Sequence, residues 1–120
     1  MSMSVPTLHA TLQVDGVKVF YRSAGSPSLP ILLLLHGFPS SSFQFRNLIP
    51  LLSHRYCVIA PDLPGFGFTV VPDERNYEYT FDNLATTIEA FVDVLQLKEY
   101  AIYVFDYGVI CFLAHIMKLC

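Results

Sequence analysis

The sequence contains no tryptophan, and only 14% of its 120 residues are charged. Its lysines and arginines are scattered and the net charge is −3, so a basic face is missing and a nucleic-acid partner is not expected. Cysteine is also scarce, and the spacing of the three residues does not suit a metal. The three cysteines are Cys57, Cys111 and Cys120. We expect them to be reduced, buried thiols in a cytoplasmic protein.

A targeting segment is missing as well. The first ten residues have neither a basic region nor an apolar core, so a secretory signal is not expected. The most apolar stretch begins at Tyr100, but Asp106 and Gly108 interrupt it and Lys118 lies near its end. A buried strand followed by a buried helix therefore explains this stretch better than a membrane span. A small membrane-associated protein, anchored by this apolar stretch, is the least favoured of three hypotheses, after an enzyme fragment and a non-catalytic interaction module.

What the sequence does have is apolar residues, 53% of the chain, in patterns typical of strands. They alternate on both sides of Asp15-Gly16, which indicates a two-residue hairpin turn between antiparallel strands. Two unbroken apolar runs, 30–35 and 56–61, are typical of strands covered on both faces. The apolar segment 101–105 predicts a fifth strand, and Asp106 follows it directly.

The remaining apolar segments predict three helices. The first covers Ser40–His54, with a break or restart at Pro50 near its end. The second extends from an N-cap at Thr80 to about Leu97, because its apolar residues recur on one face. The third extends from about Gly108 to the end. The alternation of strands and helices after the hairpin predicts an α/β fold whose sheet is parallel in its later part.

Three short motifs follow the predicted parallel strands, and ligands bind beyond the carboxyl ends of such strands. The motifs are His-Gly-Phe-Pro at 36–39, Asp-Leu-Pro-Gly-Phe-Gly at 62–67 and Phe-Asp-Tyr-Gly at 105–108. Each alone also fits a structural role, as a strand-to-helix turn, an ordinary turn or a helix cap. The second motif lacks the third glycine of a dinucleotide fingerprint, so no nucleotide cofactor is expected.

Together, in this order and spacing, the three motifs resemble the front half of an α/β-hydrolase. The nearest branch contains the epoxide hydrolases and haloalkane dehalogenases, and the resemblance extends from about residue 8 to 108. It implies an antiparallel hairpin plus parallel strands in the order 1-2-4-3-5, flanked by helices. It also implies that residues 1–120 form one partial domain that stops after the nucleophile elbow, without the cap domain and the C-terminal strands.

The resemblance assigns roles to the residues of the motifs. Asp106 takes the place of the nucleophile on the elbow. The backbone N–H groups of Phe38 and Tyr107 take the place of the oxyanion hole. The residues that shape these loops are His36, Gly37, Pro39 and Gly108. Tyr77 and Tyr79 are not expected to replace the ring-opening tyrosines, which the family carries in the cap domain.

An aspartate at the elbow restricts the chemistry. It is ionised at neutral pH, so it can attack a saturated carbon without a base and form an ester of the enzyme. A small electrophile, an epoxide or an alkyl halide, is therefore the expected substrate of a full-length form, without any metal or other cofactor. Dehalogenases hold the halide with side-chain N–H donors, but Phe38 and Tyr107 stand at those places here. Epoxide-hydrolase-like ancestry is therefore favoured.

The family's catalytic acid and histidine come after the nucleophile. His115 follows Asp106 too closely to be that histidine, so the chain is not expected to complete turnover alone. The alternative is a non-catalytic interaction module or truncated pseudoenzyme. Strand five would be an open apolar edge in this chain, which predicts self-association or poor solubility.

Overall fold

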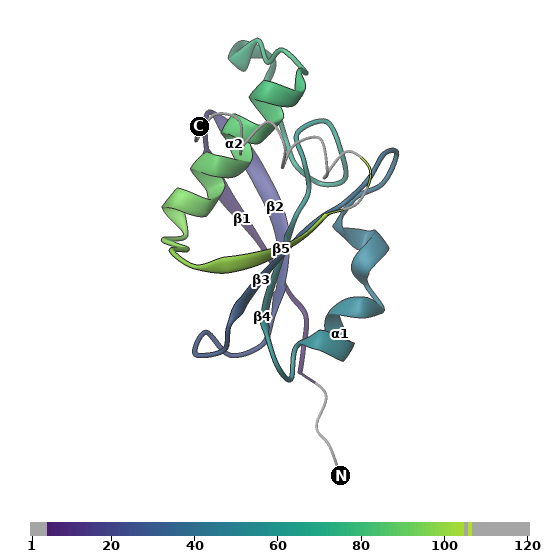
Figure 1. Ribbon diagram of the computed structural model, residues 1–120. Helices are drawn as coiled ribbons and strands as arrows, with labels where there is room; N and C mark the ends of the chain where they lie inside the picture. Colours follow the sequence, from purple (N-terminus) through teal and green to yellow (C-terminus); the bar gives the residue numbers. More distant parts are fainter. Residues whose placement is uncertain (1–4, 105, 107–120) are drawn as a thin grey trace.

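The computed structural model describes residues 5–104 and Asp106, and these form one sheet with helices on its two faces (Figure 1). The strand order is β1-β2-β4-β3-β5, as expected. β1 pairs with β2 and β2 with β4 in antiparallel fashion, whereas β3 lies parallel to both β4 and β5. The strands are β1 (Leu8–Val14), β2 (Val17–Ala24), β3 (Ile31–Leu35), β4 (Cys57–Pro61) and β5 (Tyr100–Val104).

The hairpin between β1 and β2 turns at the predicted pair of residues. Asp15 and Gly16 both have positive φ, 53° and 69°. This pair of angles matches the sense of twist of the flanking strands, and Asp-Gly adopts it at low cost. Val14 and Val17 are therefore opposite each other in the ladder, and both are buried.

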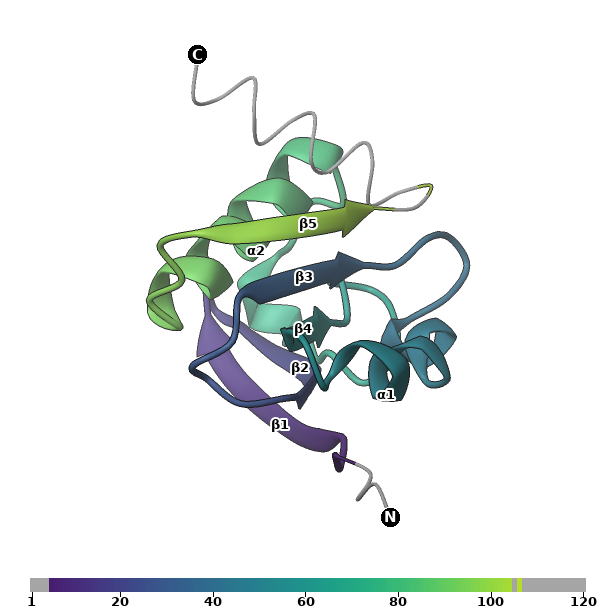
Figure 2. The same cartoon turned by 60° about the horizontal axis from the view of Figure 1, so that its bottom comes forward.

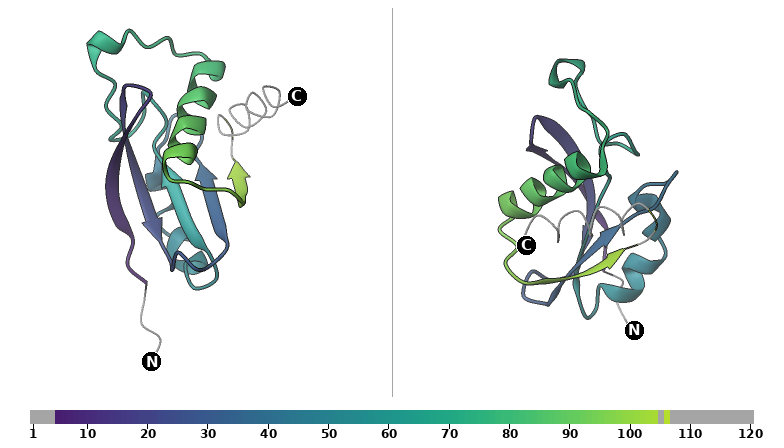
Figure 3. Two further views of the ribbon diagram at one scale, coloured as in Figure 1. Left: turned by 90° about the vertical axis from the view of Figure 1, so that its left-hand side faces the viewer. Right: turned by 45° about the horizontal axis from the view of Figure 1, so that its top comes forward.

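The strands β3 and β4 are covered on both faces, which explains their unbroken apolar sequences (Figure 2). Leu33 and Leu35 of β3 belong to the core beneath helix α2 (Phe81–Val94). Leu34 points the other way, into a second core formed with helix α1 (Leu48–Leu52). The two further views show α1 and α2 on opposite sides of the sheet (Figure 3).

The prediction of one helix over Ser40–His54 is wrong. The structure has a short 3-10 helix η1 (Ser42–Phe45), then a separate α1, with the break before Pro50 rather than at it. Pro50 is the third residue of α1, where its missing N–H needs no partner within the helix. The apolar residues of this segment therefore belong to two short elements.

Helix α2 begins where the sequence predicts and ends earlier. The Thr80 hydroxyl accepts the N–H of Asn83 at 3.1 Å, as an N-cap does. The helix ends at Val94 instead of near Leu97 because Gln96 takes a left-handed conformation, φ 60°. The N–H groups of Gln96 and Leu97 then donate to Asp93 O and Val92 O, which satisfies the last turn in a Schellman motif. A 3-10 turn, η2 (Asp73–Arg75), lies in the loop before α2.

β5 is the outermost strand in the described part of the chain. It pairs with β3 on one side, and no described residue pairs with its other side. Ala101 and Tyr103 are exposed, so β5 is less buried than its apolar sequence suggests. The predicted final helix from Gly108 lies outside the described residues, as do Cys111, His115 and Cys120. Within the described residues, no helix has the length and apolar character to cross a bilayer.

Candidate active site

The first two sequence motifs, and Asp106 of the third, lie at the carboxyl ends of β3, β4 and β5. Leu35 of β3 is opposite Val104 of β5 in the parallel ladder. Continuing three residues from Leu35 and two from Val104 brings Phe38 next to Asp106. Pairing of strands far apart in the sequence thus places the first motif beside Asp106, with the second motif following the neighbouring strand β4.

Asp106 is exposed and held in an unusual backbone conformation. Its φ is 54°, a left-handed conformation that costs energy for most non-glycine residues and is found more often for Asp and Asn. The N–H of Phe38 donates to Asp106 Oδ2 at 2.8 Å. One carboxylate oxygen is therefore held by a backbone donor across 68 positions of sequence. Tyr107 and Gly108, which the resemblance includes in the site, lie outside the described residues.

The loop that presents the Phe38 N–H is fixed by bonds on both sides. The N–H of Gly37 donates to Gln44 Oε1 at 3.0 Å, and the N–H of Ser40 donates to Gly37 O at 3.0 Å. The peptide bond between Phe38 and Pro39 is cis. The Phe38 N–H thus points towards Asp106 from a rigid turn, and it does not take part in the sheet ladder.

His36 is fully buried and links the first motif to the second. Its Nε2 accepts the N–H of Leu63 at 2.9 Å, and its Nδ1 lies 3.0 Å from Gly37 O. These partners assign the neutral tautomer with the proton on Nδ1. Burial lowers the pKa of His36, and the Gly37 carbonyl and the nearby Asp62 carboxylate oppose this shift only in part. His36 is therefore a neutral support for both loops, the role that the sequence analysis favoured over catalysis.

The pKa of His36 predicts that acid weakens the fold. Below about pH 6.5 the histidine of the unfolded chain binds a proton, whereas His36 in the folded chain does so only at lower pH. The free energy of unfolding therefore decreases as the pH is lowered. Urea unfolding between pH 7.5 and 5.5 should show this loss, at most about 1.4 kcal/mol per pH unit. His36→Gln should flatten the dependence, and His54→Gln at an exposed turn should leave it unchanged. An equal slope in wild type and His36→Gln would contradict the prediction.

Asp62 is the residue whose role the sequence analysis missed, because its motif also fits an ordinary turn. Its side chain is fully buried, and Oδ1 accepts the Ser42 N–H at 2.7 Å while Oδ2 accepts the Phe68 N–H at 2.9 Å. A Cβ on Gly67, whose φ is 54°, would collide with Asp62 Oδ2. The signal available in the sequence was a carboxylate directly after a buried strand and ahead of two glycines.

A cavity of about 800 Å³ opens beside the turn formed by residues 37–40, here called the Phe38 turn. Its lining includes the rings of Phe38, Phe66, Tyr79 and Phe81 together with Pro64, Gly65, Thr80 and Leu84. Phe66 packs edge-to-face against Phe38, with ring centroids 6.0 Å apart. Phe38 therefore belongs both to the hydrogen bond with Asp106 and to the wall of the cavity.

The other described histidines and the described cysteine do not join the site. Nε2 of His9 lies 2.9 Å from a guanidinium nitrogen of Arg22, and His54 is exposed in the turn after α1. Cys57 begins β4 at the opposite end of the strand, and it is half-buried rather than buried as expected. Burial raises the pKa of its thiol. In residues 5–104 and 106, no group of three His, Cys, Asp or Glu side chains could hold a metal ion.

Known proteins have sequences similar to that of this chain. A family model described as alpha/beta hydrolase fold matches residues 30–114. An uncharacterized hydrolase of Saccharomyces cerevisiae is 52% identical over 90% of this chain, and a soluble epoxide hydrolase of a Corynebacterium strain is 34% identical over 88%. A haloalkane dehalogenase of Psychrobacter cryohalolentis is 37% identical over 77% of the chain. These matches span 37%, 35% and 30% of the respective relatives.

Solved structures agree with the sequence matches. The epoxide hydrolase CorEH superimposes with a TM-score of 0.84 at 30% identity, over 94% of this chain and 38% of its own. The haloalkane dehalogenase DbeA of Bradyrhizobium elkani has a TM-score of 0.81 at 33% identity, over 86% of this chain and 34% of its own. The chain thus spans about a third of the length of the relatives that it matches.

Proposed function

Since the chain belongs to the alpha/beta hydrolase fold family, we propose that it carries the nucleophile and part of the oxyanion hole of a hydrolase that acts on epoxides. The observation that carries the proposal is the 2.8 Å hydrogen bond from the Phe38 N–H to Asp106 Oδ2. A left-handed aspartate two positions after the last residue of a parallel strand, facing a backbone donor, supports the assignment of a nucleophile elbow.

The two oxygens of Asp106 have different roles in this proposal. Oδ2 is held by the Phe38 N–H, whereas no hydrogen bond from a described residue engages Oδ1. Oδ1 attacks a ring carbon of the epoxide and forms a C–O bond. The bond between this carbon and the ring oxygen breaks, its electron pair passes to the ring oxygen, and water supplies a proton to that oxygen. The product is a hydroxyalkyl ester of Asp106.

The same backbone donor serves the second half of the reaction. When water attacks the ester carbonyl, negative charge develops on the oxygen that was Oδ2, which the Phe38 N–H already faces. We propose that the N–H of Tyr107 is the second donor. The water needs a base, and neither ring nitrogen of His36 is available because each has a backbone partner. The described residues therefore account for ester formation, and hydrolysis requires a base from elsewhere.

An epoxide fits the described residues better than an alkyl halide. Curated relatives include both a soluble epoxide hydrolase and haloalkane dehalogenases. A departing halide needs side-chain N–H donors, but this sequence has no tryptophan and Phe38 offers only a hydrocarbon ring. The leaving oxygen of an epoxide stays attached to the product, so the reaction does not need side-chain donors that bind a departing halide.

Alkylation of the purified chain tests the proposal. After incubation with 1,2-epoxybutane, the intact mass should increase by one epoxide, and peptide mapping should place the increase on Asp106. Mapping is essential because the chain contains three cysteines that epoxides can also alkylate. A chain alkylated only on cysteine, or not at all, would contradict an Asp106 nucleophile.

A second candidate function is interaction through the outer edge of β5, which is unpaired in the described part of the chain. An exposed strand edge offers N–H and C=O groups to another strand, so the chain could pair with itself or a partner without catalysis. Sedimentation velocity distinguishes this candidate: a defined soluble oligomer supports it, and a monomer at micromolar concentration contradicts it.

A further inference from the structure

We propose that the cavity beside Phe38 binds an aromatic substituent of the substrate, so that the electrophile is an epoxide bearing one or two aromatic rings. This inference rests on the proposed function and extends it from a reaction to a class of substrate. It is carried by the composition of the cavity wall, its size, its connection to Asp106 and the rigid support of Tyr79.

The wall of the cavity is mostly aromatic and apolar. Four of its eight described residues carry aromatic rings. Phe66 is held edge-to-face between His36, with ring centroids 5.4 Å apart, and Phe38 at 6.0 Å. An aromatic guest prefers the offset and edge-to-face contacts that such rings offer, in addition to the burial of its apolar area. Polar or charged substituents would find few partners there.

The size of the cavity also selects its guest. A cavity of about 150 Å³ suffices to bind benzene, and this one measures about 800 Å³, within the usual range of small-molecule sites. It can therefore accommodate a two-ring substituent, whereas the methyl or ethyl group of a small aliphatic epoxide would leave most of the wall without contact.

Phe38 connects this cavity to the reacting group. Its N–H binds Asp106 Oδ2 while its ring lines the cavity. The residue that binds Asp106 is therefore also a residue of the aromatic wall. A substituent attached directly to the epoxide can enter the cavity while the ring carbon meets the carboxylate.

Tyr79 forms the outer wall and has a rigid support. Its ring lies over Gly65, where a Cβ would be only 2.9 Å from Tyr79 Cε1, so a larger residue at position 65 would displace the ring. The ring also contacts Tyr77, with centroids 4.9 Å apart. Because 58% of Tyr79 is exposed, the ring is open to a ligand and can be truncated without removing part of the core.

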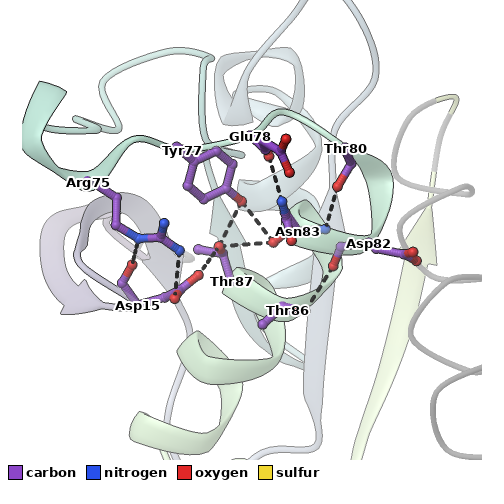
Figure 4. A network of polar contacts seen from close by, with 9 residues as sticks. All are labelled: Asp15, Arg75, Tyr77, Glu78, Thr80, Asp82, Asn83, Thr86 and Thr87. Carbon is purple, nitrogen blue, oxygen red and sulfur yellow. Dashed lines mark hydrogen bonds and ion pairs between the residues drawn. The ribbon is translucent and has the colours of Figure 1, made fainter.

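A network of polar contacts fixes the segment that carries Tyr79 (Figure 4). Arg75 donates to Asp15 O at 2.7 Å and forms an ion pair with Asp15 Oδ1 at 3.0 Å. The buried Thr87 of α2 donates to the other oxygen of Asp15 at 2.6 Å. The Tyr77 hydroxyl lies 2.8 Å from both Thr87 Oγ1 and Asn83 O. The hairpin turn, the loop and the helix are thus tied together before Tyr79.

The segment is also held at the residues immediately before and after Tyr79. The side-chain amide of Asn83 donates to Glu78 O at 2.9 Å, and Thr80 caps α2. The backbone of Tyr79 therefore has fixed neighbours in both directions. A preorganised aromatic wall binds a flat guest without first having to order itself.

Competing alkylation tests the inference. The chain is incubated with 2-naphthyloxirane and 1,2-epoxypropane. The ratio of alkylation rates at Asp106 is measured by mass spectrometry and divided by the ratio for free acetate, which removes the difference in intrinsic reactivity. We expect the naphthyl epoxide to react faster in wild type, and Tyr79→Ala to lower the ratio by about tenfold. Tyr103→Ala is the matched control, because Tyr103 is 49% exposed and contacts Phe45 in the core on the other face of the sheet. A wild-type ratio near one, or equal ratios in the two variants, would overturn the inference.

Binding of 2-(2-naphthyl)ethanol, which has no electrophile, separates this inference from the proposed function. Saturation-transfer NMR should detect binding in wild type, Asp106→Asn and Tyr103→Ala, and a markedly weaker signal in Tyr79→Ala. Alkylation of Asp106 by 1,2-epoxypropane without naphthyl binding overturns the aromatic site and leaves the proposed function standing. Naphthyl binding without alkylation by either epoxide overturns the proposed function, and with it the assignment of the substrate as an epoxide.

Discussion

Asp106→Asn is expected to abolish the ester adduct with 1,2-epoxybutane while leaving the fold intact. The amide has nearly the same shape, and its oxygen can still accept the Phe38 N–H that now binds Oδ2. It lacks the negative charge that makes the carboxylate a nucleophile, so the alkylation rate at position 106 should fall by at least about 10³-fold. Peptide mapping at fixed times measures the loss at position 106.

The matched control is Asp73→Asn, because Asp73 is an exposed aspartate in the loop before α2. This variant should be alkylated like wild type. Comparison of amide NMR spectra of Asp106→Asn and wild type establishes that the Phe38 turn is retained. Adduct formation at an unchanged rate in Asp106→Asn would eliminate the nucleophile and the proposed function together.

Asp62→Ala is expected to be strongly destabilising. It removes the acceptor for the Ser42 and Phe68 N–H groups. Hydrogen bonds to a charged acceptor contribute about 1.5–3 kcal/mol each, and unsatisfied buried donors are costly. A loss of roughly 3–5 kcal/mol in the free energy of unfolding follows, a large share of the roughly 5–15 kcal/mol of a typical domain. The midpoint of urea unfolding measures it.

Asp62→Asn keeps the experiment informative if Asp62→Ala does not fold. The amide preserves the size of the side chain and one acceptor, but its NH₂ group then faces a backbone N–H. Asp62→Asn should therefore be less destabilising than Asp62→Ala, and its free energy of unfolding should still be clearly below that of wild type. Asp73→Ala is the control, with a change within about 0.5 kcal/mol expected at an exposed position. A change as small as this in Asp62→Ala would contradict the structural role assigned to Asp62.

Local elements were predictable because their causes lie within a few residues. Asp15-Gly16 was placed in a two-residue turn, and both residues do adopt positive φ. Thr80 was placed at the N-cap of α2, and its hydroxyl does accept the Asn83 N–H. The early end of α2 was not predicted, because a left-handed Gln96 has no signal comparable to glycine in the sequence.

The first helix region shows where local patterns fail. Residues between Ser40 and His54 are rich in apolar side chains, but the segment also supplies the Ser42 N–H to Asp62 and the Gln44 side chain to Gly37. These contacts join residues far apart or in separate loops, and the local pattern does not contain them. The segment that makes them is divided into η1 and α1.

The sequence by itself determined the hairpin turn, the capped start of α2, the buried parallel strands and the place of a carboxylate just after the fifth strand. Only the tertiary structure decided which groups meet there. It brought the Phe38 N–H to Asp106, joined His36 to Leu63 and buried Asp62 between two loops. The reason is physical: turns and caps depend on neighbours within a few positions, whereas these contacts depend on strands that pair only when the whole sheet assembles.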